Sequence, residues 1–391
     1  DSLKRIKPSP TIAVTQKARE LRAAGKDVIG LGAGEPDFDT PNNIKEAAIK
    51  AIKDGDTKYT AVDGTPILKQ AIVDKFKREN NLNYTTDQIT VGAGGKHVIY
   101  NLMMATLNKG DEVIIPAPYW VSYPDIVLLA GATPIVVECS EEQGFKLTAK
   151  DLEAAITNNT KWVILNSPSN PTGACYSEQE IKNLAHVLKR KPHVHILSDD
   201  IYEHITYEGF KFFTIAQINS LKDRVLTMNG VSKAYSMTGW RVGWLIGNKS
   251  VIGLGKKIQS QATSNVSNVS QLAAEAALLN GLGVTNEMKI AFNRRRLFAT
   301  EKINSIPNLN VVNSTGAFYL FVDVSHYCSG KNGLNTSEEF CDWLLENYFI
   351  AFVPGEVFGT PGFMRLSYAL SDEDLDSGLS RLSEAIDNLN E

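Results

Sequence analysis

The chain has 391 residues, of which 43% are hydrophobic and 21% are charged, and its formal net charge at pH 7 is −4. These values are ordinary for a globular protein, so they exclude wholesale disorder and low-complexity architectures, and the length favours two domains, or three. The small negative charge offers no cationic field for a phosphate backbone, so we do not expect nucleic acid as a partner.

Signals for membranes, export and metals are weak. The longest apolar stretch, residues 126–137, is interrupted by Gly131 and Pro134 and is shorter than the roughly 18 residues of a membrane span. The N-terminal residues contain no apolar signal core, so we expect a cytoplasmic protein that does not enter the membrane. Neither the histidines nor the cysteines show metal-ligand spacing, so we expect no metal. We expect four reduced, packed cysteines, which are Cys139, Cys175, Cys328 and Cys341.

Short β-branched runs alternate with segments of helical period from about residue 86 to 250. The expected strands are residues 89–91, 113–115, 135–137, 162–165, 194–197, 225–227 and 242–246. Runs that are apolar on both faces and joined by helices predict an α/β fold, with a buried and mainly parallel sheet covered on both sides. Ligands of such sheets bind at the carboxyl ends of the strands, so chemistry is expected there.

The pattern changes after about residue 286. A long charged helical stretch, residues 288–303, precedes two short expected strands at 311–312 and 316–323 and further helices. This order predicts a second, smaller α+β domain, and the first 40 residues could pack on either domain.

A glycine turn follows the first expected strand. Gly94, Gly95 and Lys96 precede the helical run 98–107, and backbone N–H groups at such a helix start can hold a phosphate. The turn is not a P-loop, because Thr90 and His97 stand where that motif needs Gly and Ser or Thr. An ordinary strand-to-helix turn is the alternative, although Lys96 opposes the helix dipole and a nearby anion would explain it.

Polar residues also follow two later strands. Asn170 lies in the turn-forming segment 166–173, and Asp199 follows the strand 194–197. A simple loop and a helix cap are the plain interpretations. The functional interpretations are an amide that faces a ligand and an acid that pairs with a buried cation.

The most specific stretch is residues 229–244, where Lys233 lies among small and aromatic residues. Burial near another cation would lower the pKa of Lys233 below its usual value of about 10.4 and free the amine for Schiff-base chemistry. Arg241, eight residues later, could hold a phosphate with two parallel hydrogen bonds.

These residues resemble the pyridoxal 5'-phosphate (PLP) dependent aminotransferases of fold type I, class I, and within them the bacterial aspartate aminotransferase subgroup. The resemblance covers almost the whole chain, and the segments that carry it include Lys7-Pro8-Ser9, Gly34-Glu35-Pro36-Asp37-Phe38, Tyr119-Trp120-Val121-Ser122-Tyr123-Pro124 and Arg365-Leu366-Ser367-Tyr368. It implies a large PLP-binding domain, residues 41–286, with a mainly parallel seven-stranded sheet flanked by helices. The small α+β domain would combine residues 1–40 and 287–391.

The resemblance implies PLP as the cofactor, bound covalently to Lys233 as an aldimine. Lys233 also matches the lysine that moves the proton during catalysis, and Asp199 matches the carboxylate paired with the pyridine nitrogen, which makes the ring an electron sink. Tyr202 and Asn170 match hydrogen-bond partners of the ring hydroxyl. Trp120 matches the aromatic residue that stacks on the ring.

The phosphate side of the cofactor is implied in the same way. Gly94, Gly95 and Lys96 match the phosphate-side turn, and Arg241 matches the phosphate-binding arginine. Tyr59 resembles a tyrosine that reaches the phosphate in the other subunit's site, which implies a homodimer with composite active sites.

The substrate contacts follow from the same resemblance. Arg365 matches the arginine that holds the α-carboxylate, a task for which lysine is no substitute. Gly34 matches the loop over the substrate, and Trp120 and Asn170 border the substrate as well as the cofactor. Lys96 resembles the lysine that meets the distal carboxylate of aspartate or glutamate, so two anionic partners remain open for it.

The chain departs from the family pattern at two positions. Asp200 replaces the usual second acid of S-D-E-I-Y, a change expected to lie off the ring. Gly230 stands where other class I branches carry a phosphate-binding serine, so that contact is either missing or supplied by Ser232.

The expected activity is a ping-pong transamination that converts L-aspartate and 2-oxoglutarate to oxaloacetate and L-glutamate. One alternative is an aspartate- or glutamate-prephenate aminotransferase, including a bifunctional one, with which Lys7 is compatible. An aromatic-preferring aminotransferase is another. A non-catalytic PLP-binding regulator and a PLP enzyme with different chemistry are the alternatives from other classes.

Overall fold

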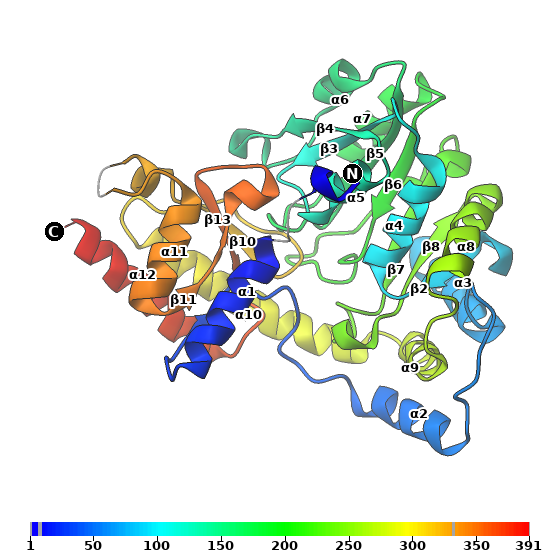
Figure 1. Cartoon of the computed structure of the whole chain (residues 1–391), viewed down its shortest axis with the longest axis horizontal. Helices are drawn as coiled ribbons and strands as arrows, with labels where there is room; N and C mark the ends of the chain where they lie inside the picture. The colour runs from blue at the N-terminus through cyan, green and yellow to red at the C-terminus, as the bar shows by residue number, and fades with distance from the viewer. Residues whose placement is uncertain (1, 7–9, 331–332, 391) are drawn as a thin grey trace.

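The computed structural model describes residues 2–6, 10–330 and 333–390 of the chain (Figure 1). Its main element is a seven-stranded sheet in the order β2-β8-β7-β6-β5-β3-β4. The strands are β2 (Ile89–Gly92), β3 (Glu112–Ala117), β4 (Thr133–Glu138), β5 (Thr160–Asn166), β6 (His195–Asp199), β7 (Val225–Gly230) and β8 (Gly243–Gly247). β8 runs antiparallel to both of its neighbours, while the other neighbouring pairs are parallel. The predicted α/β fold with a mainly parallel sheet is confirmed.

Helices cover both faces of this sheet because alternate strand residues point to opposite sides. Ile115 packs on one face against α4 (Gly95–Thr106), α5 (Ser122–Leu129) and α8 (Lys249–Ala262), whereas Ile114 packs on the other against α6 (Ala149–Ala155) and α7 (Glu178–Lys189). A further apolar cluster joins β2 and β8 to α2 (Asn42–Lys53), α3 (Pro66–Asn80) and α9 (Asn268–Leu279). β4 lies at the edge of the sheet, so Val136 is exposed there, and the expectation that every strand is buried on both faces is wrong for this one.

The C-terminal part contains a four-stranded sheet in the order β12-β13-β10-β9. Its strands are β9 (Asn310–Val311), β10 (Tyr319–Asp323), β12 (Val353–Pro354) and β13 (Phe363–Ser367), and its helices are α10 (Gly283–Asn304), α11 (Ser337–Tyr348) and α12 (Asp372–Asn390). Sequence patterns predicted β9, β10 and α10 but not β12 or β13. The two-residue strand β12 is too short to show a period, and the sequence pattern after residue 323 predicts helices only, so it misses β13 as well.

The N-terminal segment packs on this C-terminal part, as Figure 1 shows for α1 (Pro10–Ala23). β1 (Ile29–Gly30) pairs in parallel with β11 (Ile350–Ala351), and Ala18 shares an apolar cluster with Leu345. The short helix Ser2–Arg5 contacts α5 beside the large sheet instead. The division into residues 41–286 and the two chain ends remains a proposal, and its second boundary falls in the first turn of α10.

Two other expectations concern the whole chain. No helix in the described ranges is both long and apolar enough to cross a membrane. The four cysteines are free, and three of them are buried.

Candidate active site

A cavity of about 410 Å³ opens where the large sheet meets the C-terminal part. It lies at the edge that holds the carboxyl ends of the parallel strands, as the fold predicts. Because β8 is antiparallel, its start lies at the same edge, and Gly243 pairs there with Gly230. The residues that line the cavity come from nine separate segments of the chain. They are Gly32, Ala33, Gly34, Gly95, Lys96, Trp120, Val121, Asn166, Asn170, Asp199, Ile201, Tyr202, Met228, Ser232, Lys233, Thr238, Arg241, Tyr319, Phe358 and Arg365.

Asp199 is the last residue of β6 and is 3% exposed. Burial raises the pKa of its carboxyl group to about 6, although hydrogen bonds from the Tyr123 hydroxyl and the Ile201 N–H and the charge of Lys233 favour the ionised form. A buried carboxylate with this balance is stabilised by a cationic group placed next to it.

Lys233 follows β7 and points into the same cavity. Its ammonium donates a hydrogen bond to the Gly34 carbonyl. Burial lowers the pKa of Lys233 to about 8; Glu35 and Asp199 oppose this shift, whereas the cations Arg365 and Arg241 add to it. The amine therefore loses its proton far more readily than a surface lysine, as a nucleophile or base must.

In the turn between β2 and α4, neighbouring atoms lie so close to the backbone that they leave no room for a side chain. Gly94 has a φ of +89°, and a Cβ atom there would lie 2.2 Å from Nη2 of Arg241. A Cβ on Gly243 would lie 2.5 Å from the backbone nitrogen of Gly95. Arg241 donates hydrogen bonds to the carbonyls of Thr238 at 2.9 Å and Ala93 at 3.1 Å, so its guanidinium is held beside the start of α4. The result is a helix N-terminus with free N–H groups and an arginine beside it, which is a site for an anion.

Lys96 and Trp120 lie close together in the lining of the same cavity. The Lys96 ammonium lies 5.1 Å from the centre of the Trp120 ring. Burial and the nearby Arg241 lower the pKa of Lys96, while Asp125 opposes the shift. Two cations near one another favour an anionic ligand beside them.

Arg365 faces the cavity from β13 and is 4% exposed. It donates hydrogen bonds to Asn170 Oδ1 at 2.8 Å and to the Gly32 carbonyl at 2.6 Å, and its guanidinium lies 4.5 Å from the centre of the Tyr319 ring. Its Nε is buried and has no hydrogen-bond partner in the described chain. The guanidinium is thus oriented, and part of its donor capacity is left for a ligand.

The hydroxyl groups of Tyr202 and Tyr319 lie 2.8 Å apart. Burial, with Tyr319 beside it, raises the pKa of Tyr202, so this hydroxyl stays protonated and can donate to a ligand. A Cβ on Gly34 would lie 3.3 Å from the Tyr319 hydroxyl, which shows how closely the N-terminal loop approaches the site.

The structure brings most of the predicted site residues to this cavity, but it does not bring all of them. Gly94 precedes the lining residue Gly95 but does not itself line the cavity. Tyr59 is 91% exposed and lies outside the cavity. Asp200 is buried and accepts a hydrogen bond from Ser198 at 2.6 Å without lining the cavity, whereas Ser232 does line it. Lys7 lies outside the described residues.

Sequence reasoning missed several residues of the site. Tyr123 belongs to a segment that carried the family resemblance, but no local pattern indicated that its hydroxyl reaches Asp199 across 76 positions. Tyr319 is one of several apolar residues of β10, and nothing nearby in the sequence distinguishes it. Asn166, at the end of β5, could have been found, because polar residues at strand ends were the signal used for Asp199.

Comparison with known proteins agrees with this geometry. The family "Aminotransferase class I and II" matches residues 26–382. A "Probable aspartate/prephenate aminotransferase" of Rickettsia bellii is 55% identical, over 99% of this chain and 98% of its own. The crystal structure of the aspartate aminotransferase from Rhizobium meliloti has a TM-score of 0.94 at 48% identity and covers 99% of this chain and 98% of its own. The aspartate aminotransferase from Thermus thermophilus with maleate has a TM-score of 0.93 at 40% identity, with 98% of both chains covered.

The chain therefore belongs to the class I and II aminotransferases, a family of PLP-dependent enzymes with the fold type I architecture. The protein is accordingly a PLP-dependent aminotransferase, and its similarity is to aspartate and aspartate/prephenate aminotransferases in particular.

The residues of the cavity fit PLP. The glycine turn with Arg241 suits a phosphate, since a side chain at Gly94 would fill the space beside the guanidinium. The buried carboxylate of Asp199 suits a protonated pyridine nitrogen, and the Lys233 amine with its lowered pKa suits covalent attachment. These three features share one cavity, as a single ligand of this size requires.

Replacing Gly94 with Ala should weaken PLP binding by about tenfold or more, because the new Cβ would displace Arg241 from the place where we expect it to donate a charged hydrogen bond to the phosphate. Gly110→Ala is the matched control: Gly110 also has a positive φ, of +98°, but its Cβ would meet nothing within 4 Å. Equilibrium titration of the cofactor-free enzyme with PLP measures the effect. Equal affinities for the two variants would contradict the phosphate role of this turn.

Proposed function

We propose that this aminotransferase transfers the amino group of L-aspartate to 2-oxoglutarate, giving oxaloacetate and L-glutamate. The observation that carries the proposal is the pair of cations Lys96 and Arg365, which line one cavity from different parts of the fold. A substrate with two carboxylates can pair with both, whereas a neutral side chain would offer the Lys96 ammonium no carboxylate. The Thermus thermophilus enzyme was solved with maleate, itself a dicarboxylate, which supports the same preference.

The bound PLP would supply an electron sink for the charge that develops on the substrate carbon. Lys233 would hold the cofactor covalently and, once displaced by the substrate, carry the proton that leaves Cα. Its lowered pKa supports both tasks. Asp199 would keep the pyridine nitrogen protonated, and the hydrogen bond from Tyr123 would hold the carboxylate in place.

The remaining residues would orient the two molecules. Asn170 and Tyr202 would donate to the ring hydroxyl, and Trp120 would stack on the ring. Gly34 would cover the substrate and help to exclude water from the reacting atoms.

The phosphate would be held by Gly94, Gly95 and Arg241, with either Lys96 or Ser232 as a further contact. We also propose a homodimer in which Tyr59 reaches the partner's site. The 91% exposure of Tyr59 in the single chain supports this, since an aromatic ring so exposed becomes buried when a second subunit covers it.

The second candidate substrate is prephenate, because relatives at 55% identity carry the name aspartate/prephenate aminotransferase. Prephenate has two carboxylates, so it would use the same pair of cations. A bifunctional enzyme needs no second site.

A half-reaction screen tests the proposal. The PLP form of the enzyme is mixed in turn with aspartate, glutamate, tyrosine and alanine, and the amino-loaded form is mixed with prephenate. We expect aspartate and glutamate to bleach the PLP absorption and aspartate to yield stoichiometric oxaloacetate. Release of ammonia and fumarate in place of oxaloacetate would overturn the proposal in favour of elimination chemistry, and an inert enzyme would favour a non-catalytic regulator.

The variant Lys96→Met separates the two partners left open for this lysine. If Lys96 meets the distal carboxylate, the rate with aspartate should fall about ten- to a hundredfold while the rate with alanine stays unchanged, because a hydrogen bond to a charged group contributes about 1.5–3 kcal/mol. An equal fall with both amino acids, together with weaker PLP binding, would show that Lys96 serves the phosphate.

A further inference from the structure

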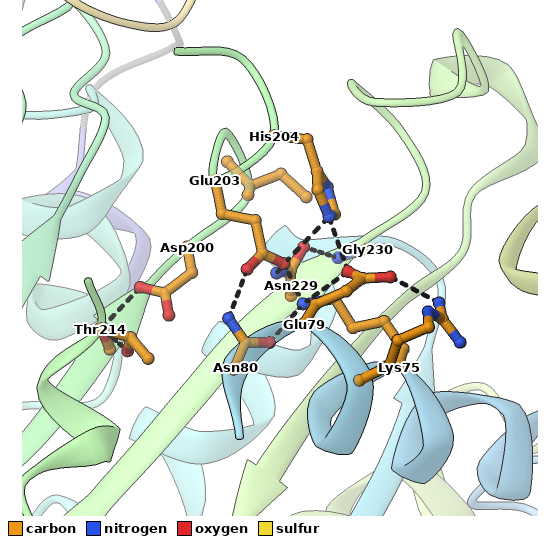
Figure 2. A network of polar contacts seen from close by, with 12 residues as sticks. Lys75, Glu79, Asn80, Asp200, Glu203, His204, Thr214, Asn229 and Gly230 are labelled. Carbon is orange, nitrogen blue, oxygen red and sulfur yellow. Dashed lines mark hydrogen bonds and ion pairs between the residues drawn. The ribbon is translucent and has the colours of Figure 1, made fainter. Parts of the chain in front are cut away.

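Figure 2 shows a buried ionic network whose residues do not line the cavity. Lys75, near the end of α3, has a side chain that is only 1% exposed and forms an ion pair with Glu203. Its ammonium also donates to Asn80 Oδ1 at 2.8 Å and lies 3.6 Å from a carboxylate oxygen of Glu79. None of these side chains lines the cavity, so the network does not touch the substrate or the cofactor site directly.

Glu203 connects three segments of the chain. Besides Lys75 of α3, its carboxylate accepts hydrogen bonds from Asn80 Nδ2 at 2.9 Å and from Asn229 Nδ2 at 2.5 Å. Asn229 lies near the end of β7, and its Oδ1 accepts from the N–H of Gly230 at 2.7 Å. One carboxylate therefore joins α3, the segment after β6 and the end of β7.

Glu203 and Asn229 are close in the sequence to the proposed catalytic residues. Glu203 directly follows Tyr202 and comes four residues after Asp199, while Asn229 comes four residues before Lys233. The network thus joins the two short segments that carry the proposed catalytic residues.

The charged groups of the network are paired with one another. Burial acts to raise the pKa of Glu203, but the charges of Lys75 and His204 and the hydrogen bonds from Lys75 and Asn80 lower it overall, so the carboxylate stays ionised. Glu79, Glu203 and His204 could also be read as a metal site, since their ligand atoms lie within 4.8 Å of one another. The Lys75 ammonium already lies between the two carboxylates, so the cluster has its cation.

We propose that Lys75, Glu203 and Asn229 are positioning residues for transamination, which hold the segment of Asp199 and Tyr202 in a fixed place relative to Lys233. A fully satisfied buried polar network makes its surroundings rigid. A displacement of about 1 Å at a reacting group can cost about a hundredfold in rate, even when the change lies away from the chemistry. This inference rests on the function proposed above.

The test compares Lys75→Met and Asn229→Ala with the control Lys69→Met. Lys69 belongs to the same helix and pairs with Asp63 at 2.9 Å, with side-chain exposures of 13% and 11%, and the second ion partner of Asp63 is Lys256 of α8, not a residue of β6 or β7. We expect the first two variants to lower kcat about ten- to a hundredfold while KM for aspartate stays within about twofold, since no substrate contact is removed. They should also change the visible circular dichroism of bound PLP, whereas Lys69→Met should leave kcat and this spectrum unchanged.

Each result decides the inference. The inference would be overturned if Lys75→Met and Asn229→Ala fold and show the same kcat and the same spectrum as Lys69→Met. The network would then have a purely structural role. If Lys75→Met does not fold, Asn229→Ala decides alone, because it keeps the buried ion pair and removes only the link to β7. A wild-type enzyme that does not react with aspartate would contradict the proposed function instead, and the spectrum of bound PLP, which needs no substrate, would still test the network.

Discussion

Replacing Lys233 with Ala should lower the rate of transamination by about 10⁴-fold or more, because under the proposed function it removes both the amine that attaches PLP and the base that moves the proton. The amine is half-buried in the cavity and its pKa is lowered to about 8, so a lysine on the surface cannot take its place. PLP should still bind through the glycine turn, Arg241 and Asp199. The variant should therefore contain the cofactor but lack the absorption band of its covalent form.

Absorption spectra and single-turnover kinetics with aspartate check this expectation. Exogenous methylamine is a useful control, since a small free amine can replace part of the lost proton transfer without restoring the attachment. Normal transamination by Lys233→Ala would refute the assignment of the catalytic lysine.

Replacing Arg365 with Lys should reduce kcat/KM for aspartate about ten- to a hundredfold, since a lysine cannot present two parallel N–H groups to a carboxylate and one charged hydrogen bond contributes about 1.5–3 kcal/mol. The guanidinium is already oriented by Asn170 and the Gly32 carbonyl, and its Nε has no partner in the described chain. A lysine would keep the charge but lose this orientation. We therefore expect kcat/KM to fall although the positive charge is kept.

Steady-state kinetics with aspartate and with 2-oxoglutarate, which in the proposed ping-pong reaction use the same site in turn, should show the loss for both. PLP affinity is the internal control and should stay unchanged, because Arg365 is assigned to the substrate alone. A variant that loses PLP affinity but keeps its KM for aspartate would show that Arg365 serves the cofactor.

The strands of the large sheet could be predicted because each one carries its own pattern. Seven β-branched runs correspond to seven observed strands, and helical periods separate them. The motif around Lys233 was equally clear, because a lysine among small and aromatic residues differs from a surface lysine within a few positions of sequence. Such signals are local, since strand and helix formation depends on neighbouring side chains.

Contacts between distant residues could not be predicted in this way. The hydrogen bond from Tyr123 to Asp199 and the link between Tyr202 and Tyr319 join positions 76 and 117 residues apart. The ion pair of Lys75 and Glu203 joins positions 128 residues apart. No period or spacing in the chain marks these partners, because each was an ordinary residue of its own helix, strand or loop.

The sequence by itself thus determined the α/β class, the carboxyl edge of the sheet as the place for chemistry, and the residues that resemble a PLP site. Only the tertiary structure decided that the cations Lys96 and Arg365 line one cavity and that the pKa of Lys233 is lowered. The physical reason is that burial and charge–charge interactions depend on distances in space. Those distances are set when segments far apart in the sequence fold around one cavity, so they belong to the folded chain as a whole.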